Sequence, residues 1–121
     1  LSVVDFVECA SYGQISTKCD VYSYGIVLME LVTGRRPTDF EFNEMEDNKV
    51  GAYSLIKLIE SRVKLNDIND IIDQALKIEF DSNEEESITD ILTISLKCTQ
   101  DNPGDRPNME EIITKLNSMH H

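Results

Sequence analysis

The chain has 121 residues, of which 40% are hydrophobic, and a formal net charge of −12. This length and apolar content suit one globular domain with its own core, and they exclude a disordered tail. The negative charge argues against nucleic acid as a partner and against direct contact with an anionic membrane, because both would require basic residues.

A loop followed by a long apolar helix is predicted at the amino-terminal end. Residues 1–16 lack a helix cap and predict an extended entry and a loop. The next helix is predicted over Lys18–Thr33, because Thr17 opens a capping pattern and Gly34 and Pro37 end the helical run. Its apolar residues cover nearly the whole circumference, which predicts a buried central helix.

The middle of the chain predicts one surface helix between acidic loops. Residues 35–52 have no hydrophobic period and predict a long surface loop. Apolar residues recur at helical spacing over Tyr53–Lys64, which predicts an amphipathic helix, and Ile68–Leu76 predicts one or two further helical turns. Acidic residues cluster at 39–47 and 79–90, and these clusters predict solvated loops.

Two helices are predicted in the carboxy-terminal third. The first covers Glu85–Gln100, and the turn residues Asp101–Gly104 follow it. The last helix has Asn108 as its N-cap and Glu111 as the second residue of a capping box. With no convincing strand pattern, the sequence predicts an all-α domain with about four main helices, one of them buried at the centre, and long acidic loops.

The cysteines indicate no special chemistry. Cys9, Cys19 and Cys98 have no close paired spacing, so they form neither a disulfide framework nor a zinc site. Cys19 and Cys98 lie in apolar helical stretches and are predicted to pack as small hydrophobic residues. Such cysteine usage suits a reducing compartment.

Two motifs in the same order carry a resemblance to a known family. The first, at Asp20–Gly25, reads Asp-x-Tyr-Ser-x-Gly, and the second, at Cys98–Met109, reads Cys-x4-Pro-x2-Arg-Pro-x-Met. With Gly34–Pro37 between them, they resemble the C-terminal half of a protein kinase. The similarity is greatest to plant receptor-like Ser/Thr kinases of the leucine-rich-repeat type, and it covers roughly residues 8–119.

The resemblance implies structural roles for four residues. Asp20 matches the aspartate that holds the catalytic loop through backbone N–H groups, and Gly25 belongs to the same motif. Arg106 matches the arginine that pairs with the glutamate of the Ala-Pro-Glu motif, which falls here on Glu8 although the alanine and proline are absent. The alternatives are a solvated loop acid for Glu8 and an exposed turn residue for Arg106.

The signature runs of phosphoryl transfer do not occur in the sequence. There is no Gly-x-Gly-x-x-Gly, Val-Ala-Ile-Lys, His-Arg-Asp or Asp-Phe-Gly. Residues 1–121 therefore resemble a partial kinase domain, without the N-lobe, the catalytic loop and the metal-binding motif. We expect no catalytic, cofactor-binding or metal-binding residue in this chain, whereas the parent family uses ATP and magnesium.

Three interpretations follow. The chain is a truncated receptor-like Ser/Thr kinase that is inactive alone, or a pseudokinase-type interaction module in signalling, or an unrelated helical protein. The first two imply a protein partner or the missing kinase portion. They also imply a cytoplasmic location, on the cytosolic side of the plasma membrane if the chain is part of a receptor.

Overall fold

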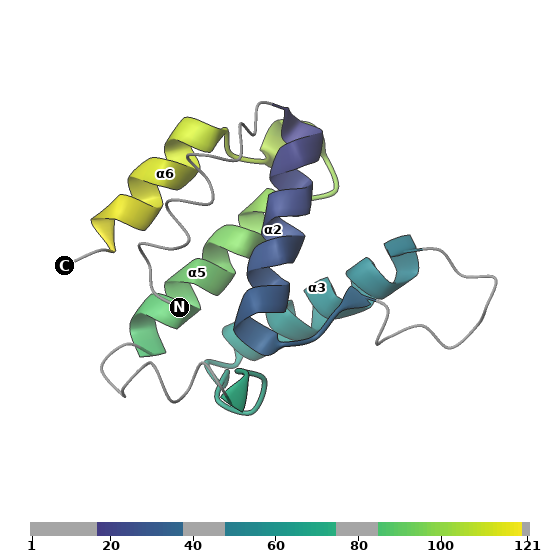
Figure 1. The fold of residues 1–121 in the computed structure, drawn as a ribbon, viewed down its shortest axis with the longest axis vertical. Helices are drawn as coiled ribbons and strands as arrows, with labels where there is room; N and C mark the ends of the chain where they lie inside the picture. Colours follow the sequence, from purple (N-terminus) through teal and green to yellow (C-terminus); the bar gives the residue numbers. More distant parts are fainter. Residues whose placement is uncertain (1–16, 38–47, 75–84, 120–121) are drawn as a thin grey trace.

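The computed structural model describes residues 17–37, 48–74 and 85–119, and these residues form an all-α arrangement (Figure 1). No described residue lies in a strand, which confirms the predicted fold class. The predicted acidic loop residues at 39–47 and 79–84 lie outside the described residues. The helices are α2 (Lys18–Thr33), α3 (Asn48–Lys64), α5 (Glu85–Cys98), the 3-10 helix η3 (Pro103–Asp105) and α6 (Met109–Ser118).

Helix α2 lies at the centre of the described elements. It packs most extensively against α5 and also contacts α3 and η3, while α3 contacts α5 in turn. Figure 1 shows α2 crossing α5, with α3 and α6 on opposite sides of the pair. The largest fully buried side chains come from all four α-helices and from the turn after α3: Val21, Leu28, Met29, Val32, Leu55, Ile59, Ile68, Ile91, Leu92, Ile112 and Leu116.

Both ends of α2 agree with the sequence prediction. The side chain of Thr17 accepts a hydrogen bond from the backbone N–H of Asp20 at 3.1 Å. At the other end, Gly34 has a φ of 69°, and its N–H donates to the carbonyl oxygen of Glu30 at 2.8 Å. That left-handed conformation is one a glycine adopts without steric cost, so the cap fixes where the helix stops.

The predicted burial of the central helix is confirmed for one side of α2, whereas another side is exposed. Asp20, Ser23, Val27 and Leu31 lie along one exposed stripe of the helix, and Val27 and Leu31 are 40% and 39% exposed. Helices α3 and α5 and the η3 segment cover only the opposite side, where the buried residues recur three or four positions apart. We refer to these four residues as the exposed stripe of α2.

Helices α2 and α5 approach each other closely at Gly25. A Cβ atom at this position would lie 2.7 Å from Cβ of Cys98 and 2.8 Å from Cγ2 of Thr99. Two buried hydroxyls near this contact are satisfied within α5, because Ser95 donates to the carbonyl oxygen of Leu92 and Thr99 donates to that of Ser95. Gly25 therefore permits a close helix contact that contains no unsatisfied hydroxyl.

The start of α3 differs from the prediction. The helix begins at Asn48 rather than at Tyr53, so residues 48–52 are not part of a loop. Gly51 explains the difference, because a Cβ atom there would collide with the carbonyl oxygen of Pro37. Glycine disfavours a helix by local propensity, yet here it lets the first turns of α3 lie against the chain that follows α2.

Two further boundaries were predicted only in part, and a third is confirmed. Residues 65–73 form turns rather than regular helix, with Ile71 N–H bonded to the carbonyl oxygen of Ile68 at 3.1 Å. Helix α5 ends at Cys98, and η3 occupies the place of the predicted type II turn. The capping box of α6 is confirmed, because the side chains of Asn108 and Glu111 each accept a bond from the other's backbone N–H.

The two described cysteines differ in exposure. Cys98 is fully buried, as predicted, whereas Cys19 is exposed, contrary to the prediction. Burial raises the pKa of the Cys98 thiol to about 12, and the nearby positive charge of Arg106 lowers it only in part. The Cys98 thiol therefore stays protonated near neutral pH and packs as an apolar group.

We expect Gly25→Ala to destabilise the chain by about 1–3 kcal/mol, because the new methyl group overlaps Cys98 and Thr99. In an open helix the same change would stabilise by about 0.5–1 kcal/mol, so the sign of the effect tests the contact. Urea unfolding followed by circular dichroism measures it. Ser23→Ala, at an exposed position of the same helix, is the control and should change stability little.

We also expect stability to fall at alkaline pH. Above its unfolded pKa of about 9, Cys98 loses its proton in the unfolded chain but keeps it in the folded chain until pH approaches about 12. The free energy of unfolding should therefore fall by about 1.4 kcal/mol per pH unit across this window. Unfolding curves between these pH values measure the slope. Cys98→Ala should lack this contribution, and an identical slope in the variant would contradict the assignment.

Candidate functional site

Arg106 ties the segment after α5 to the beginning of α2. Its Nε donates to the carbonyl oxygen of Gln100 at 2.7 Å, Nη1 to that of Lys18 at 3.0 Å, and Nη2 to that of Asp101 at 3.4 Å. In return, Nζ of Lys18 donates to the carbonyl oxygen of Arg106. Guanidinium donors in a fixed fork suit such a set of carbonyl acceptors, so the two segments are held together in both directions.

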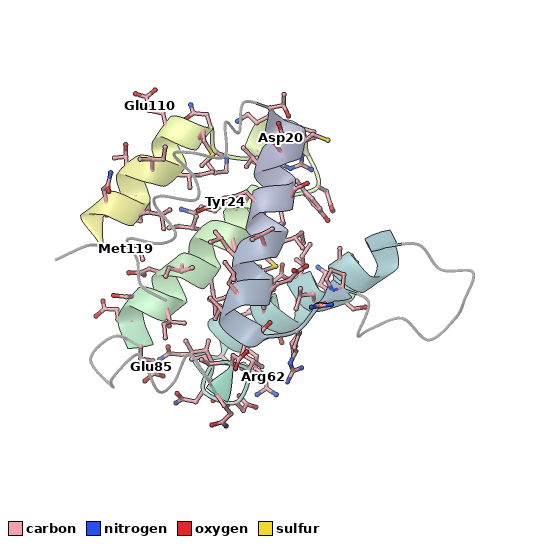
Figure 2. The ribbon with its side chains drawn as sticks, viewed as in Figure 1. Asp20, Tyr24, Arg62, Glu85, Glu110 and Met119 are labelled. Carbon is pink, nitrogen blue, oxygen red and sulfur yellow. The ribbon has the colours of Figure 1, made fainter. Side chains whose placement is uncertain are left out.

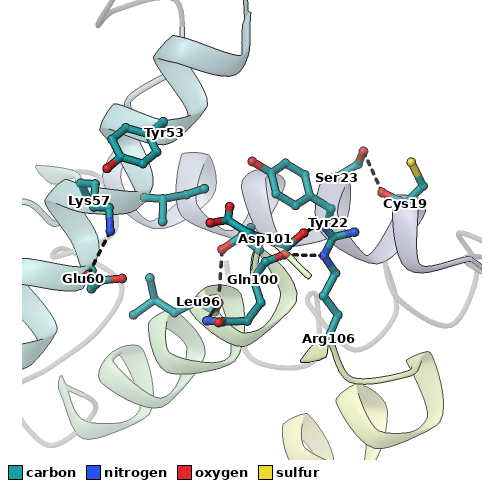
Figure 3. A pocket seen from close by; sticks show the side chains of 12 residues that line it. Cys19, Tyr22, Ser23, Tyr53, Lys57, Glu60, Leu96, Gln100, Asp101 and Arg106 are labelled. Atoms are coloured by element: carbon teal, nitrogen blue, oxygen red, sulfur yellow. Dashed lines mark hydrogen bonds and ion pairs between the residues drawn. The ribbon is translucent and has the colours of Figure 1, made fainter. Parts of the chain in front are cut away.

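The guanidinium of Arg106 also stacks on Tyr22. Its Cζ atom lies 4.8 Å from the centre of the Tyr22 ring, within the range of a cation–π contact (Figure 3). Burial raises the pKa of the Tyr22 hydroxyl, the positive charge of Arg106 opposes this, and the negative charge of Asp101 adds to it. Tyr22 is therefore a neutral aromatic platform for Arg106 rather than a proton donor near neutral pH.

Asp20 lies at the same end of α2 as Arg106 but has a different environment. Its side chain is exposed, and no described residue donates a hydrogen bond to its carboxylate. Figure 2 shows Asp20 at the amino-terminal end of α2, where a negative charge is favoured by the helix dipole. Within the described residues, Asp20 presents a carboxylate acceptor to the outside of the domain, at one end of the exposed stripe.

The structure brings three of the four predicted site residues onto or against α2. Asp20 and Arg106 mark its amino-terminal end, and Gly25 forms the contact with α5. Glu8 lies outside the described residues, so the predicted Glu8–Arg106 ion pair stays a prediction. The alternative that Arg106 is merely an exposed turn residue is not supported, because its side chain is half-buried and bonded to both neighbouring segments.

A groove that the sequence did not predict lies between α2, α3 and the end of α5. Its volume is about 670 Å³, within the range of ligand-binding pockets. Figure 3 shows Tyr53, Lys57 and Glu60 of α3 on one side and Tyr22 and Asp101 on the other. We call it the α2–α3–α5 groove, and it is lined by Cys19, Tyr22, Ser23, Tyr53, Ile56, Lys57, Glu60, Leu96, Thr99, Gln100, Asp101 and Arg106.

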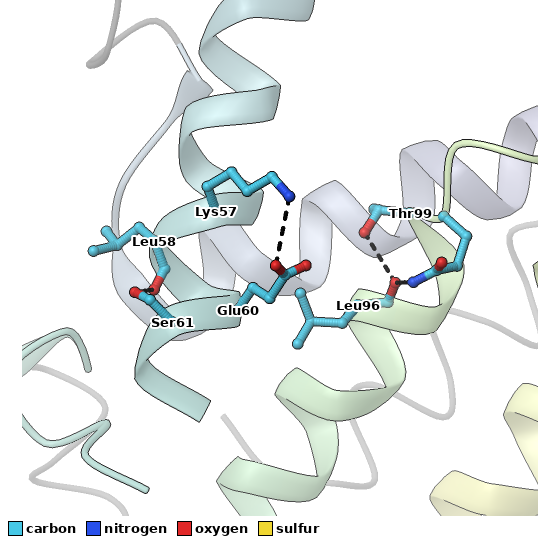
Figure 4. A network of polar contacts seen from close by, with 7 residues as sticks. Lys57, Leu58, Glu60, Ser61, Leu96 and Thr99 are labelled. Carbon is cyan, nitrogen blue, oxygen red and sulfur yellow. Dashed lines mark hydrogen bonds and ion pairs between the residues drawn. The ribbon is translucent and has the colours of Figure 1, made fainter. Parts of the chain in front are cut away.

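The α3 side of the groove has its own polar contacts. Nζ of Lys57 lies 5.3 Å from the centre of the Tyr53 ring and 3.5 Å from Oε1 of Glu60. On the opposite side, the side chains of Thr99 and Gln100 both donate to the carbonyl oxygen of Leu96 (Figure 4). Helical spacing places Tyr53, Lys57 and Glu60 on one face, but the second wall of the groove depends on the tertiary fold.

The described residues limit the chemistry of the site. Among them, no group of three or more histidine, cysteine, aspartate or glutamate side chains could hold a metal ion. The buried Cys98 thiol, with its pKa of about 12, is no nucleophile near neutral pH. No helix in the described part of the chain is both long enough and apolar enough to cross a membrane.

The sequence as a whole matches a known family. The family described as protein tyrosine and serine/threonine kinase matches residues 6–116, nearly the whole chain. Both motifs singled out above, at Asp20–Gly25 and Cys98–Met109, fall inside this range. The amino-terminal part of the match includes Glu8, which agrees with the extent of the resemblance inferred from the residues.

Several plant proteins are similar to this chain. The LRR receptor kinase SERK2 of Oryza sativa subsp. japonica is 37% identical over 109 residues, which cover 90% of this chain and 17% of the relative. A probable LRR receptor-like serine/threonine-protein kinase of Arabidopsis thaliana is 40% identical over 104 residues, covering 86% of this chain and 16% of the relative. The receptor-like protein kinase HAIKU2 of Arabidopsis thaliana is 34% identical over 109 residues, which cover 90% of this chain and 10% of the relative.

The chain thus spans less than a fifth of the length of these relatives. The matched residues include the central helix, the Arg106 tether and the capping box of the last helix, all of which the structure describes. The resemblance inferred from the motifs is confirmed by these matches. The chain belongs to the protein tyrosine and serine/threonine kinase family, and its similarity is to plant LRR receptor-like serine/threonine kinases.

Proposed function

We propose that this chain is the C-terminal helical part of a Ser/Thr protein kinase and that it supports catalytic residues supplied by the rest of the kinase. In this role the complete enzyme transfers the γ-phosphate of ATP to serine or threonine of a protein. The chain alone, residues 1–121, is a partial kinase domain without ATP-binding or catalytic residues. ATP and magnesium belong to the missing kinase portion, which is the partner that this proposal requires.

The exposed stripe of α2 is the observation that carries this proposal. It combines an acceptor carboxylate at Asp20 with the apolar side chains of Val27 and Leu31 on one side of the central helix. A partner segment that packed on the apolar residues would bring its backbone N–H groups within reach of the carboxylate. Charge-assisted bonds of this kind are short and strong, so Asp20 could fix the shape of a loop.

The Arg106 tether supports the same role. By binding the carbonyl oxygens of Lys18, Gln100 and Asp101, Arg106 fixes the end of α2 that bears Asp20. The α2 residues that Arg106 contacts, Lys18 and Tyr22, each lie two residues from Asp20 along the helix, so a change at Arg106 would shift the Asp20 carboxylate. In this proposal Arg106 is a positioning residue, because it acts through the end of α2 that bears Asp20.

In this proposal the nucleotide and its metal ion bind outside residues 1–121. The printed sequence contains none of the signature runs for phosphate or magnesium binding, and the described residues contain no suitable acid cluster. No step of phosphoryl transfer is therefore assigned to this chain. Its proposed contribution is to hold the catalytic loop that another part of the kinase provides.

A second candidate is a non-catalytic, pseudokinase-type interaction module in signalling. The α2–α3–α5 groove favours it, because its largely polar lining also contains two tyrosines and the apolar side chains of Ile56 and Leu96, a mixture that suits a protein ligand. For either role we propose a cytoplasmic location, on the cytosolic side of the plasma membrane if the chain is part of a receptor. The names of the relatives as receptor kinases support this location.

A chimera separates the two roles. This chain replaces the matching segment in the kinase domain of the rice relative, and transfer of phosphate from ATP to a serine peptide is measured. We expect the chimera to transfer phosphate and the isolated chain to show neither transfer nor ATP binding. Asp20→Asn should lower kcat of the chimera by about tenfold or more, because a carboxamide cannot accept charge-assisted bonds.

Glu86→Gln, which removes an exposed acid from the first turn of α5, is the matched control and should leave kcat unchanged. Saturable ATP binding by the isolated chain would contradict the absence of a nucleotide site. A chimera that folds but transfers no phosphate would contradict the supporting role and leave the interaction module as the function.

We expect Arg106→Lys to destabilise the chain by about 1–3 kcal/mol, because an ammonium cannot reach three carbonyl oxygens and stack on Tyr22. Thermal unfolding of the purified chain measures the loss. Arg62→Lys is the matched control, since Arg62 forms ion pairs with Asp67 and Asp70 at exposed positions that contribute about 1 kcal/mol or less. If both variants lost the same amount of stability, the contacts of Arg106 would stabilise the chain no more than an exposed ion pair does.

A further inference from the structure

The two walls of the α2–α3–α5 groove offer aromatic and apolar surface to the solvent. Tyr53 is 58% exposed on the α3 side, and Ile56 and Leu96 are half-buried between the walls. Exposed aromatic rings beside apolar side chains are typical of the centre of protein interfaces. The groove therefore has the surface needed to hold an apolar side chain of a ligand.

The cationic groups in the groove are already engaged inside the chain. The guanidinium of Arg106 donates to three backbone carbonyl oxygens and stacks on Tyr22. The ammonium of Lys57 lies over the Tyr53 ring and beside the carboxylate of Glu60. An acidic ligand would have to displace these contacts, which disfavours phosphate or carboxylate groups as the ligand chemistry.

The anionic groups in the groove are less engaged. No described residue donates a hydrogen bond to the carboxylate of Asp101, which is exposed at the end of α5. Glu60 pairs with Lys57 at 3.5 Å, and both side chains are about half exposed, so this ion pair is weak and readily exchanged. The carboxylate of Asp101 on one wall is thus left to pair with a cation, and Glu60 on the other wall can accept a cation of the ligand by exchanging it for Lys57 (Figure 3).

The charge of the whole chain acts in the same direction. With a net charge of −12, the chain attracts basic ligands at long range and repels acidic ones. Arginine combines a guanidinium that pairs with carboxylates and a planar face that stacks on tyrosine rings. An arginine flanked by apolar residues would match the carboxylates, the tyrosine and the apolar side chains together.

We propose that the α2–α3–α5 groove binds a basic peptide segment of a protein partner. An arginine or lysine of the peptide pairs with Asp101 and Glu60, and an adjacent apolar residue packs on Tyr53, Ile56 and Leu96. The groove shares only Ser23 with the exposed stripe of α2, so this binding site is separate from the surface assigned to the missing kinase portion. The inference does not depend on the proposed function.

Fluorescence anisotropy of the purified full chain tests this assignment. The probe is a fluorescein-labelled peptide in which arginines alternate with leucines, and a second peptide of the same length carries glutamate in place of arginine. We expect saturable binding of the arginine peptide and none of the glutamate peptide. Failure of the arginine peptide to saturate, or equal binding of both peptides, would overturn the proposal.

Two variants locate the binding site. Asp101→Asn should weaken binding of the arginine peptide by about tenfold, because it removes the charge of the unpaired carboxylate. Tyr53→Ala should also weaken binding severalfold. Tyr53 is largely exposed, so its loss should leave the helical circular dichroism unchanged.

Glu110→Gln is the matched control, because it removes the same charge from the exposed start of α6, away from α3 (Figure 2). It should change the affinity less than twofold. If Asp101→Asn and Glu110→Gln weaken binding equally, the peptide responds only to the total charge, and a specific site in the groove is refuted.

Discussion

The close contact between α2 and α5 at Gly25 is the constraint on which the rest of the described structure depends. Because Gly25 has no side chain, α2 approaches α5 closely, and Cys98 and Thr99 lie against its backbone. This contact places the end of α5 beside the start of α2. Only from there can Arg106, a few residues later in the chain, reach the carbonyl oxygen of Lys18 and the ring of Tyr22. One missing side chain thus determines the position of the tether.

Local chemistry made part of the fold predictable. The ends of α2 and the start of α6 follow from side chains that bond backbone groups three or four residues away, as at Thr17, Gly34 and Asn108. The start of α3 could not be predicted, because Gly51 lies in a helix for a tertiary reason, its contact with Pro37. Arg106 was singled out by its motif, but its bonds to three carbonyl oxygens were not predicted, and the groove, whose walls come from distant segments, carries no sequence signal.

The hydrophobic pattern showed which faces of α2 are apolar, but it did not show which of these faces are packed against other helices. An apolar circumference indicates that most faces of a helix favour burial, yet α3, α5 and η3 reach only one side. Val27 and Leu31 are therefore about two-fifths exposed, although their neighbours Leu28 and Val32 are fully buried. The proposed supporting role uses these exposed apolar residues, together with an acid that has no described partner, as its interaction surface.

Helix α2 contributes to three surfaces, which are the core, the exposed stripe and the α2–α3–α5 groove. Its geometry allows all three to be occupied at once. Its core face is fixed by α5, its stripe ends at Asp20, and Tyr22 and Ser23 turn toward the groove. The donors of Arg106 that reach Lys18, Gln100 and Asp101 point into the chain, so a ligand in the groove need not break the tether. Binding at the groove and packing on the stripe could then occur on the same molecule. Any coupling between them would have to pass through the first turn of α2, because that turn borders both surfaces.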